Sequence, residues 1–138
     1  MARPRGVGGG RYRPLVDAVT VLGPRGTRLR ARLPTTARER ARGLLGRTRL
    51  DPEEAMLFAG ARSVHTLGMR FPIAVAHLGR DLGILRVRIV TPWRLVLPVG
   101  EARHVLECSP EVDLRVGDRL RVAPGHAASS RHRARSSV

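Results

Sequence analysis

The chain has 138 residues, enough for one domain with a modest core but too few for two domains of ordinary size. Its formal net charge is +15, from 26 basic and 11 acidic residues, and every basic residue is arginine. Proteins that hold phosphates commonly use lysine beside arginine, because the two side chains bind phosphate differently. The positive charge is therefore weaker evidence for nucleic-acid binding than its size suggests.

Both ends of the chain are basic and poor in large apolar residues. Residues 1–14 and 121–138 each carry four arginines and no acidic residue. Such segments bury too little apolar surface to offset the entropy of ordering. The sequence predicts a flexible basic tail at 1–14, one β-rich domain at 15–122 and a second flexible basic tail at 123–138. Tails of this kind attract nucleic acid or an anionic surface, or serve only for solubility.

The cellular compartment is predicted from what the sequence lacks. The apolar stretch that follows the basic start is interrupted by Asp17, and no small-residue cleavage site follows. No apolar run approaches the roughly 20 residues that span a membrane. Cys108 is the single cysteine, which excludes an intrachain disulfide. We expect a cytoplasmic protein.

The first predicted elements form a β-hairpin. Residues 15–22 alternate as a strand, residues 23–26 (GPRG) read as a turn, and residues 27–33 form a second strand. In the second strand Leu29 and Ala31 share one face. Its other face is a candidate basic surface made of Arg28, Arg30 and Arg32.

A helix is expected after the hairpin. Thr36 and Glu39 have the spacing of a capping box, and the following apolar residues recur with helical period. Gly46 is a suitable left-handed terminator.

The rest of the domain returns to short strands. We place them near residues 55–58, 63–67, 73–78, 84–90, 94–97, 103–108 and 118–122. The predicted fold is mainly β: a compact antiparallel β-sandwich or barrel-like domain with one short helix packed on it.

Two short stretches supply candidate ligand or partner contacts. In SVHTLGMRFPI, residues 63–73, His65 offers a titratable ring and Arg70 a planar anion-binding fork. A histidine inside a β-domain is more commonly a buried structural residue. In TPWRL, Trp93 and Arg94 suit stacking on a base, a sugar or a side chain, although the single tryptophan could equally be the core anchor.

Catalytic, metal and cofactor sites have little support. His104 and Cys108 share one face of a predicted strand but lie about 13 Å apart along it, and no spacing typical of zinc ligands occurs. We expect Cys108 to be buried and inert. No two acidic residues form a recognisable acid/base pair. We therefore assign no catalytic residue, no metal site and no cofactor.

The order of the motifs carries a family resemblance. The stretches ERARGLLGR, AMLF, SVHTLGMRFPIAVAHL, PWR, ARHVLE and LRVGDRL follow one another between about Val16 and Val122. This series resembles the small bacterial and archaeal domain-of-unknown-function family catalogued as number one-nine-two. The resemblance implies a compact β-rich domain with one helix, no established cofactor and no agreed activity, and a partner in pilus-assembly or secretion machinery.

Two positions depart from the family pattern. The aspartate that usually follows Pro-Ile is Ala74 here, and the aromatic residue three positions later is His77. If the family aspartate holds a ligand, this chain has lost that ligand contact. If the aspartate instead pairs with an arginine such as Arg70, its absence leaves Arg70 free. Both departures favour a binding module over an enzyme.

Three functions remain open at this point. The first is a non-catalytic module that binds a protein partner. The second is an arginine-driven binder of nucleic acid or an anionic surface. The third is a small-ligand protein or hydrolase with a pocket near His65 and Arg70, which requires those residues and Trp93 to converge.

Overall fold

The computed structural model describes residues 18–34 and 48–123, and it confirms a mainly β domain. The predicted helix that begins at Thr36 lies outside the described residues, as do both predicted tails apart from Ala123. The described elements are β1 (Ala18–Leu22), the 3-10 turn η1 (Pro24–Gly26), β2 (Arg28–Arg32), β3 (Glu54–Ala59), β4 (Val64–His65), β5 (Ile73–Leu78), β6 (Ile84–Val90), β7 (Leu95–Val96), β8 (His104–Cys108) and β9 (Arg121–Ala123).

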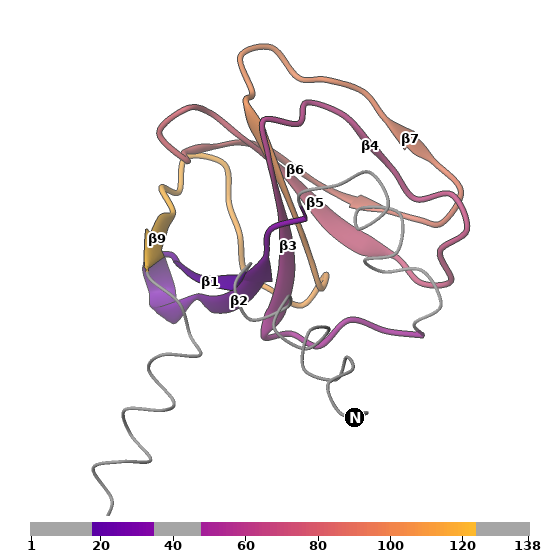
Figure 1. Ribbon diagram of the computed structural model, residues 1–138, viewed down its shortest axis with the longest axis horizontal. Coiled ribbons are helices and arrows are strands. Elements are labelled where there is room, and N and C mark those ends of the chain that lie inside the picture. The colour runs from indigo at the N-terminus through magenta and orange to yellow at the C-terminus, as the bar shows by residue number, and fades with distance from the viewer. Residues whose placement is uncertain (1–17, 35–47, 124–138) are drawn as a thin grey trace, which may run out of the picture.

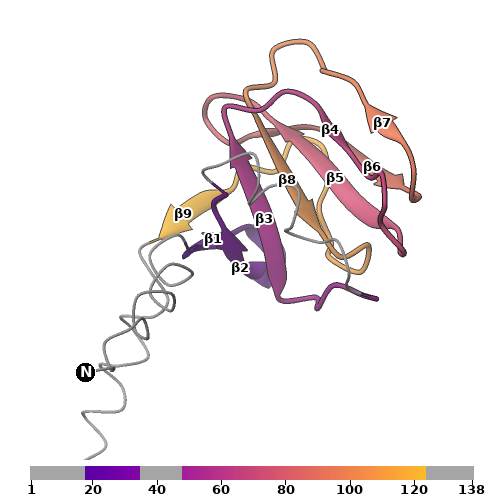
Figure 2. The same ribbon diagram turned by 45° about the vertical axis from the view of Figure 1, so that its right-hand side comes forward.

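Seven of these strands form one curled sheet in the order β6-β5-β8-β3-β2-β1-β9. Neighbouring strands are antiparallel except β2 and β3, which run parallel. Figures 1 and 2 show β1, β2 and β9 together on one side of the molecule and β5 and β6 on the other, with β3 between them. Strands β4 and β7 form a separate two-stranded sheet, which we call the ribbon.

The first hairpin forms as the sequence predicts. Its turn needs two residues in the left-handed region, and these are Arg25 at φ 60° and Gly26 at φ 82°. In β2, Leu29 and Ala31 are buried while the three arginines are exposed. The alternation of β2 therefore turns its apolar side chains into the core and leaves the basic face in solvent.

The sheet is covered on both faces at β3, β5 and β8, so most side chains of these strands are buried. On one face the core is formed by Leu29, Leu57, Leu78 and Leu106, closed by Leu120. All six residues of β5 are buried. The side chains of the second core, on the other face, are Leu50, Met56, Phe58, Met69, Phe71, Ile73, Val75, Val90, Val96 and Val105.

Three predicted strands are wrong in length or position. The strands expected at 63–67 and 94–97 are limited to Val64–His65 and Leu95–Val96. Residues with a left-handed backbone lie just outside the two predicted ranges, Gly68 at φ 82° and Trp93 at φ 66°. The last strand begins at Arg121 rather than 118. The residues before it pair elsewhere: the amide of Ile84 donates to the carbonyl of Asp118 at 2.8 Å.

Candidate functional site

The ribbon joins two segments that lie about 30 residues apart in sequence. His65 pairs with Leu95 and Val64 with Val96 in an antiparallel register. Figure 2 shows β4 and β7 lying together on the side of the molecule away from β9. Val96 points inward to the second core. The ribbon thus covers that core with its inner side and exposes its outer side.

Thr66 fastens the two segments of the ribbon together. It is fully buried, and its hydroxyl donates to the carbonyl of Thr91 at 2.9 Å and accepts from the amide of Arg94 at 2.8 Å. Its amide donates to the carbonyl of Arg94, and its carbonyl accepts from the amide of Trp93. One buried residue therefore satisfies several backbone groups of the 91–94 turn.

Trp93 occupies an unusual backbone conformation at the tip of this turn. Its φ of 66° lies in the left-handed region, where a bulky side chain is strained. Its side chain contributes nothing to the core, because the residue is 65% exposed. The sequence left a core role for Trp93 open, and its exposure contradicts that alternative. Backbone strain kept in place by surrounding hydrogen bonds is characteristic of functional sites.

Other large apolar side chains on the ribbon are exposed too. Leu95 and Leu97 flank the buried Val96, so strand alternation places both on the outer side. We use the name apolar patch for the four exposed residues Leu67, Trp93, Leu95 and Leu97. They lie on the two segments that the ribbon pairs, and exposed apolar groups close together are typical of interaction surfaces.

The structure brings three of the four predicted contact residues into this region. His65 and Arg94 are exposed on the ribbon beside Trp93. The alternative reading of His65 as a buried structural residue does not hold, because its strand lies at the surface. Its Nδ1 accepts a hydrogen bond from the amide of Leu67 at 3.3 Å. Arg70 is exposed in the loop that follows, and no hydrogen bond or ion pair joins it to the other three within the described residues.

The ribbon lacks the geometry of a catalytic centre. No carboxylate among the described residues hydrogen-bonds to His65, and the hydrogen bond that its Nδ1 accepts comes from the backbone amide of Leu67. Cys108 is buried, as predicted, and desolvation with the nearby Glu107 raises the pKa of its thiol to about 12. A thiol with that pKa is a poor nucleophile. No group of three or more metal-binding side chains occurs in the described parts of the chain.

Sequence reasoning missed two buried polar residues on the sheet face that the ribbon covers. His77 pairs with Val105 and Glu107 with Val75, so the histidine and the glutamate are diagonal neighbours on β5 and β8. Burial raises the pKa of Glu107 to about 8. The signal was present in the sequence, because each residue interrupts an apolar strand.

The environment of His77 favours the neutral form of its ring. Desolvation lowers its pKa, and the cations of Arg86 and Arg88 add to this effect, while the nearby backbone of Leu97 opposes it. Neither ring nitrogen reaches a partner with hydrogen-bond geometry in the described chain. Burial of an unpaired polar ring costs free energy.

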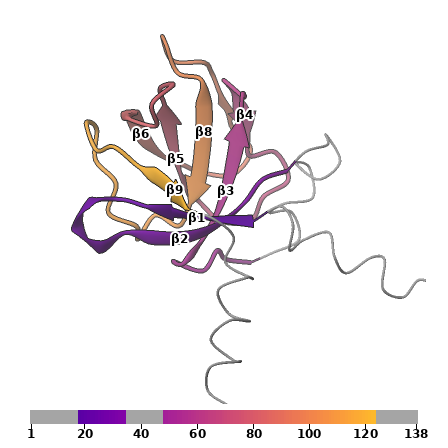
Figure 3. The same ribbon diagram turned by 60° about the vertical axis from the view of Figure 1, so that its left-hand side comes forward.

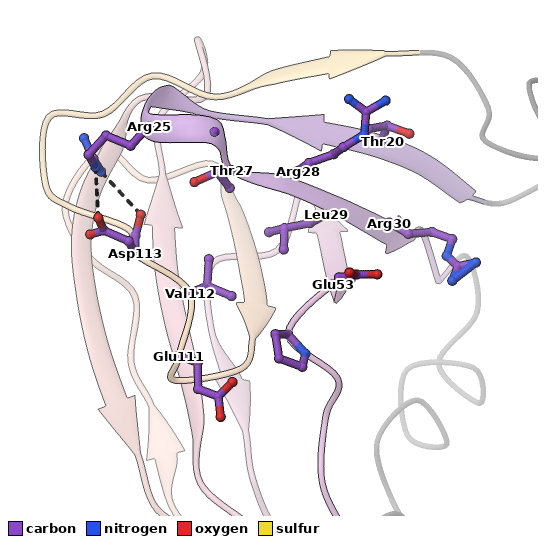
Figure 4. Close-up of a pocket in the computed structure, with 12 residues that line it drawn as sticks. Thr20, Arg25, Thr27, Arg28, Leu29, Arg30, Glu53, Glu111, Val112 and Asp113 are labelled. Atoms are coloured by element: carbon purple, nitrogen blue, oxygen red, sulfur yellow. Dashed lines mark hydrogen bonds and ion pairs between the residues drawn. The ribbon is translucent and has the colours of Figure 1, made fainter.

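A separate pocket of about 510 Å³ lies beside the candidate basic face (Figure 4). Arg28 and Arg30 line it, but so do the carboxylates of Glu53, Glu111 and Asp113. Its charge is therefore mixed, and it does not form a cationic groove. Neither His65 nor Arg70 nor Trp93 lines this pocket, which lies away from the ribbon.

Arg25 links the hairpin to the loop on the far side of the pocket. Its Nε donates to Asp113 Oδ2 at 3.0 Å, and its guanidinium also binds Asp118. The hydrogen bond from Arg25 lowers the pKa of Asp118. The pKa of Asp113 is lowered by hydrogen bonds from two side chains, most strongly by that from Arg115 and less by that from Arg25. These contacts give Arg25 a structural role, because its guanidinium is already bound by two carboxylates.

The fold and the ribbon define a small β-domain with an exposed apolar patch and no visible catalytic machinery in its described residues. The chain belongs to the DUF192 family, whose description is "Uncharacterized ACR", and the family model matches residues 20–122. This confirms the resemblance drawn from the motifs. A comparison with curated proteins finds no significant match.

Two solved structures share the fold. A protein of unknown function from Novosphingobium aromaticivorans is 25% identical with a TM-score of 0.64, and the match covers 75% of this chain and 83% of the other. A putative transcription regulator from Sinorhizobium meliloti is 22% identical with a TM-score of 0.59, covering 76% of this chain and 92% of the other. No helix in the described residues has the length and apolar character needed to cross a membrane.

Proposed function

We propose that this domain is a non-catalytic binding module whose apolar patch contacts a protein partner. The observation that carries the proposal concerns Trp93. Its indole is exposed, its backbone is strained, and that backbone is hydrogen-bonded to the buried Thr66. Exposure without support would suggest a mobile side chain, whereas here several hydrogen bonds fix the turn. Tryptophan and arginine are the residue types that most often dominate binding energy at interfaces, and Trp93 and Arg94 are adjacent.

The charge around the patch favours an acidic partner. Residues 62–100 contain six arginines and a single acidic residue, Asp81. Asp81 lies in the 79–83 turn and pairs with Arg119 at 2.9 Å. None of the six arginines forms an ion pair with a described acidic residue, so their charge is available to a partner. Complementary charge at the rim of an interface raises the association rate and selects the partner.

The test is comparative capture with the full chain and matched variants. Trp93→Ser and Leu97→Ser remove exposed apolar side chains from the patch, while Val116→Ser removes one from another loop with matching exposure, 65% against 63% for Leu97. We expect a partner that binds the wild type and Val116→Ser but binds both patch variants at least about tenfold more weakly. Components of pilus-assembly or secretion machinery, the partner class that the resemblance implies, are tested first as purified proteins. Equal binding by all four proteins would refute the proposal.

Nucleic-acid or anionic-surface binding is the second candidate, favoured by one observation. Strand pairing aligns Arg28 and Arg121 on either side of Leu22, which adds a fourth arginine to the exposed face of Arg28, Arg30 and Arg32. Binding by this face would weaken steeply with salt because counterions are released. Capture that nuclease abolishes, and that Arg28→Ala with Arg30→Ala weakens, would support this candidate over the first.

A further inference from the structure

Within residues 18–34 and 48–123, strand β6 leaves one margin of the large sheet without a neighbouring strand. It is the last strand in the sheet order, paired on its inner side with β5 (Figure 3). At its beginning the outer side is closed, since the amide of Ile84 donates to Asp118 and its carbonyl accepts from Gly117. Beyond that point no described residue pairs with the outer edge of residues 86–90. An edge of five residues spans about 17 Å.

The two faces of this edge differ in chemistry. Arg86 and Arg88 point to the face that holds His77, with which Arg86 is paired. Val87 and Ile89 point to the opposite face, and Ile89 is 56% exposed. None of the described acidic residues forms an ion pair with Arg86 or Arg88. A strand added here would meet apolar side chains on one face and unpaired cations on the other.

We propose that the outer edge of β6 accepts an extended segment of the protein partner, in which acidic and apolar side chains alternate, as an additional strand. Backbone hydrogen bonds would supply affinity, and the alternating side chains would supply specificity, as in other cases of strand addition. Cross-strand pairing would set the carboxylates beside Arg86 and Arg88 and the apolar side chains beside Val87 and Ile89.

This inference rests on the proposed function. It extends the proposed partner interface from the apolar patch to the outer edge of β6. The chain passes from Val90 through Thr91 and Pro92 directly to Trp93, so the open edge leads to the apolar patch. The backbone of Leu97 lies near His77, whose cross-strand partner is Arg86. The edge and the patch can therefore contact one continuous segment of a partner.

A second copy of this chain fits the edge poorly. In an antiparallel pair of two β6 strands centred on Val87, Arg86 of each copy would lie opposite Arg88 of the other. Like charges directly opposite one another destabilise a strand pair, and charged edges are a common defence against self-association. A single-stranded nucleic acid would satisfy the arginines but would leave the apolar face and the backbone edge unused.

The first test uses a synthetic peptide in which glutamate and valine alternate, labelled for fluorescence anisotropy, with the full chain. A peptide with the same composition in two blocks controls for net charge. We expect the alternating peptide to bind at least about tenfold more tightly than the block peptide. We also expect it to slow amide exchange at alternate residues of 86–90, because every second amide of an edge strand points outward. Equal binding of both peptides, or binding without protection of β6, would overturn the inference.

Charge reversal provides the matched variants. Arg86→Glu with Arg88→Glu should weaken binding of the glutamate–valine peptide at least about tenfold and favour a lysine–valine peptide instead. Arg28→Glu with Arg30→Glu makes the same change on β2, an interior strand of the sheet, and should leave peptide binding close to that of the wild type. If the variant with Arg86→Glu and Arg88→Glu did not bind the lysine–valine peptide more tightly than the glutamate–valine peptide, strand addition would be contradicted.

The two proposals fail separately. If partner capture depends on Trp93 but the alternating peptide does not bind β6, the edge has another role and the patch proposal stands. If the peptide binds β6 and Trp93→Ser captures the partner normally, the patch proposal fails. Self-association of the full chain in sedimentation, lost on Arg86→Ala with Arg88→Ala, would identify a second copy as the occupant and overturn the inference.

Discussion

The carbonyl oxygen of Thr66 accepts a hydrogen bond from the amide of Trp93 at 2.9 Å, so a fully buried residue fixes the backbone of an exposed indole. The Thr66 hydroxyl adds bonds to Thr91 and Arg94 on the same turn. The shape of the apolar patch therefore depends on a residue that no partner can touch.

Thr66→Val should loosen the ribbon while keeping the side-chain shape. It leaves the carbonyl of Thr91 and the amide of Arg94 without their buried partner, which should cost about 1–3 kcal/mol in the free energy of unfolding. Urea denaturation measures the cost, and amide exchange at Arg94 should accelerate. Thr66→Ser keeps the hydroxyl and should stay closer to the wild type. Identical stability for both variants would show that the hydroxyl contributes nothing.

Substitution of Trp93 should separate backbone strain from the indole. Trp93→Gly and Trp93→Ala both remove the ring, but glycine adopts a φ of 66° without the steric cost that alanine pays. We expect the glycine variant to be more stable than the alanine variant by about 1 kcal/mol, the reverse of the usual ranking within a strand. Chemical denaturation of the two variants tests this, and a more stable alanine variant would contradict strain at this position.

Glu107 should make stability fall as the pH rises. Its carboxyl keeps its proton in the folded state up to a pKa of about 8, whereas the unfolded chain loses it near the ordinary value of 4.5. Between these pH values the folded state binds more protons, so stability decreases by up to about 1.4 kcal/mol per pH unit. Glu107→Gln should flatten the dependence in unfolding curves measured between pH 5 and pH 8. A slope that survives this substitution would assign it to another group.

His77 should make the free energy of unfolding fall as the pH is lowered. Its pKa is lowered in the folded state, so below about 6.5 the unfolded chain takes up a proton that the folded ring does not, and stability falls with falling pH. His77→Phe replaces the imidazole with an apolar ring and so removes two unpaired nitrogens. We expect a gain of about 1 kcal/mol at neutral pH and a weaker loss in acid. A less stable phenylalanine variant would indicate that the packing around residue 77 accommodates the imidazole ring but not the larger phenyl ring.

Local pattern in the sequence determined much of the fold. Alternation in β2 sets Leu29 against the core and Arg28 in solvent because successive side chains of a strand point to opposite faces. The left-handed turn at Gly26 and the burial of Cys108 follow from equally local signals. The order of motifs also sufficed to place the chain in its family.

The tertiary structure decided which segments meet. Nothing in the sequence around His65 specifies Leu95 as its partner, because the pairing depends on hydrogen bonds and burial across about 30 intervening residues. The same holds for His77 and Glu107, which strand order alone makes neighbours. Periodicity in the sequence determines which face of its strand a side chain occupies. Long-range packing between strands determines which other side chains it contacts. For that reason the candidate contact residues His65, Trp93 and Arg94 could be named from sequence, while the buried threonine that hydrogen-bonds to the last two could not.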